Sequence, residues 1–239
     1  MVTDPAEFYD VIYAFKDYAA EAAHVHRLIR RYTQAPGRRL LDVGCGTGMH
    51  LAFLRHYDYA LEGLDYSAAM LAQARRRCPA IPFYQGDMAT FRLDHQVDIL
   101  TCLFSAIGHV AGPAGLAQTL ATFYHHLQPG GIAIVEPWLT PATADGGSFI
   151  PLLAQRPPIS VARLTENRVE GRSSRQFLHY LVQTPAGVQY LQETLNQWLF
   201  TPEEYLAAFS AAGFQVEFTP RGLTDDRGLY IAQRPLAAG

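Results

Sequence analysis

Residues 38–48 read Arg-Arg-Leu-Leu-Asp-Val-Gly-Cys-Gly-Thr-Gly, and this stretch decides the fold. Its apolar part is typical of a buried strand in a parallel sheet. Three glycines follow at every second position, so the backbone can turn tightly and approach a ligand closely. The glycines lead into a predicted helix whose first amide groups face the same ligand. We therefore expect a binding site at the carboxyl end of this strand, where open α/β sheets hold their ligands.

Two acidic residues indicate what this site binds. Asp42 lies beside the glycine turn, where it would repel a pyrophosphate and suit the cationic ammonium and sulfonium groups of S-adenosylmethionine (SAM). The glycine spacing also departs from the dinucleotide pattern G-x-G-x-x-G, because the third glycine comes one residue early. Asp65 ends the next predicted strand, about 20 residues on, where a carboxylate can accept the hydrogens of both ribose hydroxyls. Together these features favour SAM over a dinucleotide.

Several stretches resemble the motif series of class I SAM-dependent methyltransferases. They are 42–48, Asp65, Gly86-Asp87-Met88 and 127–131. More narrowly, the chain resembles the N,N-dimethyltransferases of antibiotic pathways that act on nucleotide-linked 3-amino sugars, the desosamine and mycaminose type. This narrower likeness is carried by 8–10, 16–18, 42–50, 85–88, 103–109, 135–138 and 227–229, which together span almost the whole chain. The resemblance implies an N-methyltransferase that converts SAM to S-adenosyl-L-homocysteine and whose small-molecule acceptor is a TDP-linked 3-amino-deoxysugar.

The resemblance also implies which residues bind the cofactor. They come from the N-terminal segment, the glycine turn and the ends of the following strands: Tyr18, Asp42, Gly44, Cys45, Gly46, Asp65, Tyr66, Met70, Asp87, Met88, Leu103 and Ser105. Tyr66 can stack on the adenine, and Asp87 can accept a hydrogen from its amino group while the Met88 amide meets a ring nitrogen. Considered alone, Asp87 is more often a helix N-cap and Met70 more often a core residue.

The acceptor side is expected to comprise Tyr9, Phe104, His109, Trp138 and Arg227. His109 follows the end of a predicted strand, and a histidine with a reference pKa of about 6.5 can take a proton from an ammonium or orient the neutral amine. The alternative is a structural histidine that hydrogen-bonds its own loop. Tyr9 is the second catalytic candidate, as a hydrogen-bonding or ring-packing group that faces the acceptor.

Arg227 is expected to bind the pyrophosphate of the acceptor, because a guanidinium offers a fork of donors to phosphate oxygens. The alternative is a surface salt bridge with the neighbouring Asp225 or Asp226. These two acids depart from the family pattern, as does Leu139-Thr140 after Trp138. Both departures fall on the acceptor side and leave the cofactor assignment intact.

Composition excludes several classes of protein. The chain has 239 residues, 49% of them apolar and 17% charged, with a formal net charge of −3. Without a long basic run, neither nucleic acid nor an anionic membrane is an expected partner. No apolar stretch approaches the roughly 18 residues that span a bilayer, and the N-terminus lacks a secretory signal. Three cysteines without C-x-x-C spacing indicate reduced thiols in the cytoplasm, and no cluster has metal-ligand spacing, so no metal is expected.

We expect an α/β protein with a Rossmann-like, seven-stranded mixed sheet, helices on both of its faces and an inserted antiparallel β-sheet. The regions are an N-terminal helical lid (1–37), a SAM-binding core (38–138), an inserted loop and strands (139–200), and a C-terminal helix and strands that complete the core (201–239). Helices are predicted over 3–32, 47–56, 67–77, 114–127 and 201–213, and core strands over 39–43, 59–64, 81–84, 97–102, 132–136, 214–219 and 228–234.

The insertion is predicted to begin with a long loop or lid over 140–158, which is rich in Pro, Gly, Ala and Thr. Strands are then predicted over 159–168, 172–184 and 187–200. The middle strand carries apolar residues on both faces, for example Leu178 on one and Leu181 on the other. We expect one face to cover the active site and the other to pack against a second subunit, giving a homodimer.

Three other functions remain open. The first is an N- or O-methyltransferase of another small metabolite, with the same cofactor site and a different lid. The second is an NAD-dependent oxidoreductase, which the early third glycine and Asp42 disfavour. The third is a non-catalytic SAM-binding module, which His109 and the aromatic residues of the acceptor side disfavour.

Overall fold

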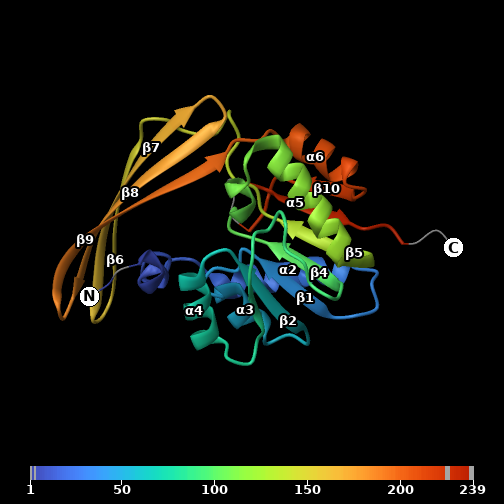
Figure 1. The fold of residues 1–239 in the computed structure, drawn as a ribbon, viewed down its shortest axis with the longest axis horizontal. Coiled ribbons are helices and arrows are strands. Elements are labelled where there is room, and N and C mark those ends of the chain that lie inside the picture. The colour runs from blue at the N-terminus through green and yellow to red at the C-terminus, as the bar shows by residue number, and fades with distance from the viewer. Residues whose placement is uncertain (1, 3, 224–226, 237–239) are drawn as a thin grey trace.

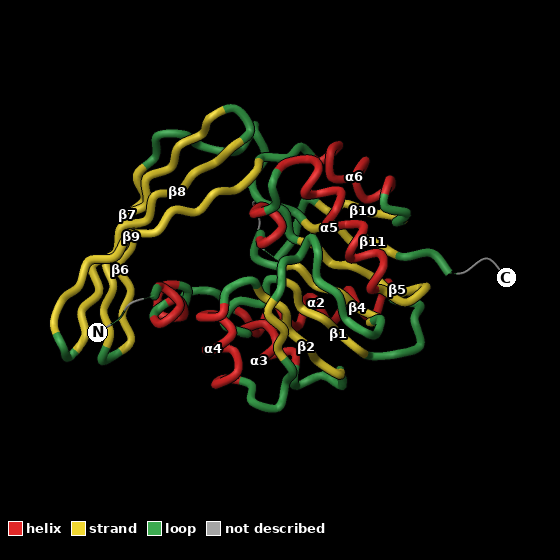
Figure 2. Tube along the Cα trace, viewed as in Figure 1, coloured by secondary structure: helices red, strands yellow, loops and turns green. Residues whose placement is uncertain are grey.

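The computed structural model describes residue 2, residues 4–223 and residues 227–236. It contains a seven-stranded mixed sheet covered by helices and a separate four-stranded antiparallel sheet (Figure 1, Figure 2). The expected fold class is confirmed. The boundaries drawn at residues 37, 138 and 200 stay predictions.

The seven-stranded sheet has the order β10-β11-β5-β4-β1-β2-β3. Its strands are β1 (Arg39–Val43), β2 (Ala60–Asp65), β3 (Phe83–Gln85), β4 (Val97–Cys102), β5 (Leu127–Val135), β10 (Gln215–Thr219) and β11 (Leu229–Gln233). The strands β1 to β5 pair in parallel, whereas β11 is antiparallel to β5 and β10. The strand order reverses between β1 and β4, and such a switch point opens the crevice in which α/β sheets bind ligands.

Helices cover both faces of this sheet. They are α2 (Tyr18–Tyr32), α3 (Met49–Leu54), α4 (Ala68–Arg77), α5 (Gly112–His126) and α6 (Pro202–Ala211). Leu40 of β1 packs in one core with α2, α3 and α4, and the next residue, Leu41, packs in a second core with α5 and α6. This alternation follows from the period of two along a strand. None of the helices in the described part of the chain is long and apolar enough to span a membrane.

The N-terminal segment is not the single helix expected over 3–32. It forms η1 (Pro5–Glu7), then α1 (Tyr9–Ile12), and α2 begins anew at Tyr18. Asp17 caps α2 by accepting a hydrogen bond from the Ala20 amide. The break has a packing cause, because Phe8 and Ile12 are buried against the inserted sheet, whereas the apolar side of α2 is buried against the main sheet.

The inserted sheet has one strand more than expected. Its strands, in spatial order, are β6 (Phe149–Arg156), β7 (Ile159–Glu170), β8 (Ser173–Thr184) and β9 (Gly187–Trp198). The loop predicted over 140–158 is therefore wrong for its second half. β6 lies at the edge of the sheet, where Pro151 is tolerated because an edge strand can lack a hydrogen-bond donor. That proline and the Pro157-Pro158 turn gave the segment a loop-like composition.

A cavity of about 1050 Å³ lies between the carboxyl ends of the main-sheet strands and the inserted sheet. Tyr9 of α1, Asp65 of β2 and Leu178 of β8 all line it, so three parts of the chain enclose one space. In Figure 1, η1 and α1 lie between the two sheets in dark blue. The cavity at the end of β1 therefore opens toward the inserted sheet.

Candidate active site

The glycine turn after β1 forms one wall of the cavity. Gly44, Gly46 and Gly48 have φ angles of 71°, 54° and 75°, a region that other residues rarely adopt. The Gly44 amide donates a hydrogen bond of 2.7 Å to the Leu64 carbonyl, which ties the turn to the end of β2. A Cβ atom at Gly44 would lie only 2.6 Å from the Ala106 Cβ. The wall is therefore bare backbone that a nucleoside can approach closely.

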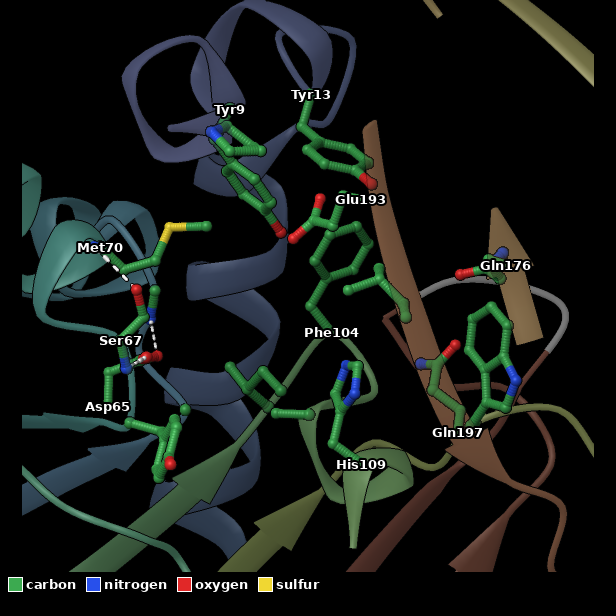
Figure 3. Close-up of a pocket in the computed structure, with 18 of the residues that line it drawn as sticks. Tyr9, Tyr13, Asp65, Ser67, Met70, Phe104, His109, Gln176, Glu193 and Gln197 are labelled. Atoms are coloured by element: carbon green, nitrogen blue, oxygen red, sulfur yellow. Dashed lines mark hydrogen bonds between the residues drawn. The ribbon is translucent and has the colours of Figure 1, made fainter. Parts of the chain in front are cut away.

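Asp65 orders the same corner. Its Oδ2 accepts the Gly46 amide and its Oδ1 accepts the Ser67 amide, both at 2.8 Å. Burial raises the pKa of Asp65, and the amides of Ser67 and Gly46 oppose that shift. Asp65 also lines the cavity, as Figure 3 shows. Because each carboxylate oxygen has more than one lone pair, Asp65 can hold the turn and still accept ribose hydroxyl hydrogens.

Asp42 lies behind the turn and does not line the cavity. It is 2% exposed and accepts a hydrogen bond of 2.7 Å from the Thr101 hydroxyl. Burial raises the pKa of Asp42 to about 6, although the charge of His50 and the hydrogen bond from Thr101 act in the opposite direction. A buried carboxyl with so little to balance its charge fits a cationic ligand beside the turn. The residues present thus fit SAM.

Eight of the twelve expected cofactor residues line the cavity: Gly44, Gly46, Asp65, Tyr66, Met70, Asp87, Met88 and Leu103. The other four, Tyr18, Asp42, Cys45 and Ser105, lie behind its walls. The Tyr18 ring packs edge-on against the His50 ring at 5.0 Å. Cys45 is a buried free thiol, and the Ser105 hydroxyl donates to the Pro137 carbonyl at 2.7 Å. The roles expected of these four residues toward the cofactor stay predictions.

The end of the cavity near β3 suits an adenine ring. Tyr66 lines it and is 76% exposed, so its ring is open to stacking. Met70 lines it too and is only partly buried, unlike a core residue. Asp87 accepts the Ala89 amide at 2.8 Å. The residues that follow form a turn and not a helix, so Asp87 is not the helix N-cap that the residue type alone favours. Its position at the cavity leaves its second oxygen available to a ligand.

Asp10, which our sequence analysis did not single out, fastens the N-terminal segment to the glycine turn. It accepts a hydrogen bond of 2.6 Å from the Thr47 hydroxyl and pairs with the Arg77 guanidinium. Tyr9, on the same short helix, faces the cavity and packs against the Tyr13 ring at 4.6 Å. A signal was present, because Asp10 falls in one of the stretches that carry the family resemblance.

A second unpredicted group stands at the cavity wall. Glu21 accepts hydrogen bonds of 2.7 Å from Lys16 Nζ and from His50 Nε2. Burial acts to raise the pKa of Glu21, but the hydrogen bonds from His50 and Lys16 outweigh it and lower the pKa overall. The Lys16 ammonium also lies 4.1 Å from the centre of the Phe104 ring. This network fixes Phe104, an expected acceptor residue, against the cavity.

His109 faces the cavity from η2 (Ala106–His109), the turn after β4 (Figure 3). Its Nδ1 lies 3.1 Å from the Asn196 carbonyl oxygen on β9. A carbonyl can only accept, so Nδ1 carries the hydrogen and the neutral ring has its lone pair on Nε2. Burial lowers the pKa of His109, with the Asn196 hydrogen bond and the charge of Asp65 acting against it. The lowered pKa favours the neutral ring at physiological pH.

Arg227 lines the cavity beside the turn that carries His109. Its Nη1 donates to the Ser105 hydroxyl at 2.9 Å and lies 4.0 Å from a carboxylate oxygen of Glu136. Its guanidinium lies 5.1 Å from the centre of the Trp138 ring. Burial raises the pKa of Glu136, and the Arg227 charge opposes that. Arg227 thus lies next to three of the expected site residues, Ser105, Trp138 and Phe104. The alternative partners, Asp225 and Asp226, lie outside the described residues.

The inner face of the inserted sheet supplies residues that our sequence analysis did not assign. Gln176, Leu178 and Tyr180 of β8 line the cavity, so theirs is the face of the inserted sheet that covers it. Glu193 and Gln197 of the neighbouring strand β9 line it as well (Figure 3). In the sequence, the alternation along each strand showed only that these residues share a face of the sheet. It did not identify which of them line the site.

The raised pKa of Asp42 predicts how stability depends on pH. Between about pH 4 and pH 6 the unfolded chain loses the Asp42 proton before the folded protein does, so ionisation costs stability as pH rises. Asp42→Asn should therefore be more stable than the wild type above pH 6, by up to about 3 kcal/mol, and the gain should shrink toward pH 4. Denaturant unfolding of the free protein across this range measures it.

A matched control is Asp98→Asn. Asp98 is also buried, but its two oxygens accept the amides of Gly37 and Arg39, so the amide should destabilise the protein. Wild-type and Asp42→Asn proteins of equal stability at pH 8 would contradict the account of Asp42.

The chain matches known proteins along its length. A methyltransferase domain family matches residues 40–131. The dTDP-3-amino-3,6-dideoxy-alpha-D-glucopyranose N,N-dimethyltransferase of Streptomyces fradiae is 42% identical, over 94% of this chain and 89% of that protein.

Solved structures agree with this likeness. The crystal structure of DesVI from Streptomyces venezuelae superposes with a TM-score of 0.90 at 37% identity, covering 98% of this chain and 100% of DesVI. The SAM-bound structure of CalS10, an amino pentose methyltransferase from Micromonospora echinaspora, gives a TM-score of 0.84 at 36% identity, covering 98% of each chain. The chain described here belongs to the family of SAM-dependent N,N-dimethyltransferases of nucleotide-linked amino sugars.

Proposed function

We propose that this protein transfers methyl groups from SAM to the amine of a TDP-linked amino-deoxysugar, giving the N,N-dimethyl product. The proposal rests on one observation: groups that suit SAM and a histidine that can accept a proton line the same cavity. The glycine turn and Asp65 suit SAM, and His109, whose Nδ1 is engaged by the Asn196 carbonyl, lines the same space. The substrates named for the relatives support an amino sugar as the acceptor.

SAM supplies a methyl group on a positively charged sulfur, which an amine lone pair can attack in line. On the protein side, the turn at Gly44 and Gly46, Asp65, and Asp87 with Met88 would hold the nucleoside part. Tyr66 would cover the adenine. Asp42, which is buried behind the glycine turn, would balance the positive charge of SAM. Alignment of the two reactants in this closed space can supply much of the rate.

His109 would prepare the acceptor. An amine enters mostly as an ammonium, whose nitrogen has no lone pair to offer. The Nε2 atom can accept that proton because Nδ1 is engaged by the Asn196 carbonyl. Tyr9 and Phe104, from α1 and the end of β4, would pack around the sugar and exclude water. Neither the removal of the proton from the ammonium nor the transfer of the methyl group requires stabilisation of an anion.

Arg227 would bind the diphosphate of the acceptor. Its guanidinium lines the cavity next to Trp138 and Ser105, where it carries a positive charge. Charge-assisted hydrogen bonds of this kind suit phosphate oxygens. The arginine also fixes the orientation of a nucleotide-linked sugar, because the diphosphate and the amine lie at different positions on the ring.

The direct test is mass spectrometry of a TDP-3-amino-3,6-dideoxyglucose incubated with the protein and SAM. We expect a gain of two methyl masses. Arg227→Ala should lower kcat/KM by roughly 10- to 100-fold, mainly through KM, because it removes charged hydrogen bonds. Arg221→Ala, at an exposed arginine, should have little effect. SAM binding without any mass gain would point to another metabolite as the acceptor.

His109→Gln tests the base. Glutamine keeps a donor for the Asn196 carbonyl but cannot take up a proton, so kcat should fall at least about tenfold. In the wild type, the acidic limb of kcat/KM due to His109 should lie below about pH 6.5, because burial lowers the pKa. His125→Gln, on the exposed end of α5, is the control. A smaller loss with an unchanged pH profile would leave His109 as an orienting residue.

We also propose that the chain forms a homodimer in the cytoplasm through the outer face of the inserted sheet. Strand register brings Leu153, Ala162, Leu181 and Tyr190 into one row across all four strands. Leu153 is 86% exposed and Leu181 53% exposed. A second copy suits this row, because a two-fold axis apposes the same patch on both subunits. The three buried, free cysteines are compatible with a reducing compartment.

Light scattering during size-exclusion chromatography tests the dimer. The wild type should elute with the mass of two chains, and Leu153→Lys together with Leu181→Lys should elute as a monomer, because charges would be buried across the axis. Leu236→Lys, at an exposed leucine that follows β11, should remain dimeric. A monomeric wild type at high protein concentration would contradict the proposal.

A further inference from the structure

Two hydrogen-bond donors lie together at the cavity without an acceptor in the described part of the chain. Arg163 on β7 and Tyr13, which directly follows α1, are partly buried and line the cavity. Arg163 Nη1 donates to the Tyr13 hydroxyl at 3.1 Å. Because the Tyr13 oxygen accepts this hydrogen bond, its own hydrogen remains to be donated, and it meets no acceptor among the described residues.

The Arg163 guanidinium also lacks a counter-charge. It forms no ion pair with any carboxylate of the described residues. Glu193, an acid of the same inner face, instead accepts a hydrogen bond of 3.1 Å from the Tyr180 hydroxyl. Arg163 Nε is fully buried, but Nη2, which also has no partner, is not fully buried and can be reached from the cavity. A partly buried cation in this state is suited to an anionic ligand.

The other lysine and arginine side chains that line the cavity differ from Arg163 in this respect. Lys16 pairs with Glu21 at 2.7 Å, and Arg227 lies 4.0 Å from a carboxylate oxygen of Glu136. Both of these glutamates balance a positive charge within the protein. The charge of Arg163 is therefore the one that a ligand has to balance.

The ligand group that fits Arg163 is a phosphate of the acceptor. In a TDP-linked amino sugar the base and the sugar rings are uncharged, the amine is a cation, and only the diphosphate is anionic. A guanidinium beside a phenol hydroxyl offers two hydrogens to the oxygens of one phosphate. SAM carries a carboxylate as well, but the glycine turn and Asp65 that suit SAM belong to the main sheet, whereas Arg163 belongs to the inserted sheet.

Arg163 and Arg227 flank the same pair of aromatic rings. The guanidinium of Arg163 lies 5.6 Å from the centre of the Tyr13 ring, and that of Arg227 lies 5.7 Å from the centre of the Phe104 ring. These two rings pack edge-on with their centres 5.1 Å apart. One guanidinium therefore stands on each side of the ring pair, as the two phosphates of a diphosphate require.

We propose that Arg163, together with the Tyr13 hydroxyl, binds one phosphate of the nucleotide-linked acceptor, while Arg227 binds the other. The inference rests on the proposed function and adds a second phosphate-binding group to it. Arg163 comes from β7 of the inserted sheet, and Arg227 precedes β11 of the main sheet. The diphosphate thus bridges the two sheets and holds the inserted sheet over the reactants.

Calorimetric titration of TDP into the protein saturated with S-adenosyl-L-homocysteine tests this site without methyl transfer. Arg163→Met removes the charge and should weaken TDP binding by about 10- to 100-fold, because charged hydrogen bonds are lost. Arg163→Lys should recover part of this loss. In a separate titration, S-adenosyl-L-homocysteine should bind Arg163→Met within about twofold of the wild type. Arg175→Met, at an exposed arginine of the neighbouring strand β8, is the control and should leave TDP binding unchanged.

The salt dependence of TDP binding separates phosphate binding from a structural role. Added salt should weaken TDP binding to the wild type more than to Arg163→Met, because the variant has one charge fewer to be screened. Tyr13→Phe leaves that charge in place, so it should cost about 2- to 10-fold in TDP affinity and keep the salt dependence of the wild type. If Arg163 only positioned Tyr13, both variants would lose the same affinity and keep the same salt dependence, which would contradict the proposal.

The remaining outcomes distinguish the phosphate site from the proposed function. Unchanged TDP binding in Arg163→Met would overturn the phosphate site. An equal loss of S-adenosyl-L-homocysteine affinity would overturn it as well, because Arg163 would then face the carboxylate of the cofactor. Neither result affects methyl transfer to the amino sugar, which mass spectrometry measures separately. If TDP binding depends on Arg163 as expected but the amino sugar gains no methyl mass, the proposed function fails and the phosphate site stands.

Discussion

The two hydrogen bonds accepted by the Asp65 carboxylate, from the amides of Gly46 and Ser67, are the interaction on which this site depends. They join the glycine turn after β1 to the start of α4 after β2, and the Leu64 carbonyl adds a third link to the same turn. Because the turn is fixed from one side, its bare backbone can face the cavity on the other. The ligand pocket is thus a consequence of how two neighbouring parallel strands end.

The second half of the site is built on a different sheet. The inserted strands place a face of both polar and apolar residues over the cavity. Phe8 anchors the N-terminal segment to that face, with its ring 5.1 Å from that of Tyr180. Asp10 anchors the same segment to the glycine turn. Asp42, behind the glycine turn, is a buried carboxyl that is poorly balanced in the free protein. Its ionisation costs stability, and its charge fits a cationic cofactor.

The sequence was most informative where local rules decide the structure. The strand at 39–43 and the turn at Gly44 follow from a short apolar run and from residues that need positive φ. The continuous helix over 3–32 was wrong because an apolar pattern does not reveal that its two halves pack on different sheets. Pro151 concealed an edge strand. The packing of Gln197 against the turn at Gly108 joins residues that are far apart in sequence, which no local pattern contains.

The most direct test of the account is a crystal structure of the protein with S-adenosyl-L-homocysteine and TDP-3-amino-3,6-dideoxyglucose. We expect the sugar amine within hydrogen-bond distance of His109 Nε2, the diphosphate against Arg227 and the ribose of the spent cofactor on Asp65. An amine that faces away from His109, or a sugar bound outside the cavity between the two sheets, would contradict the claim that these residues form one site for methyl transfer.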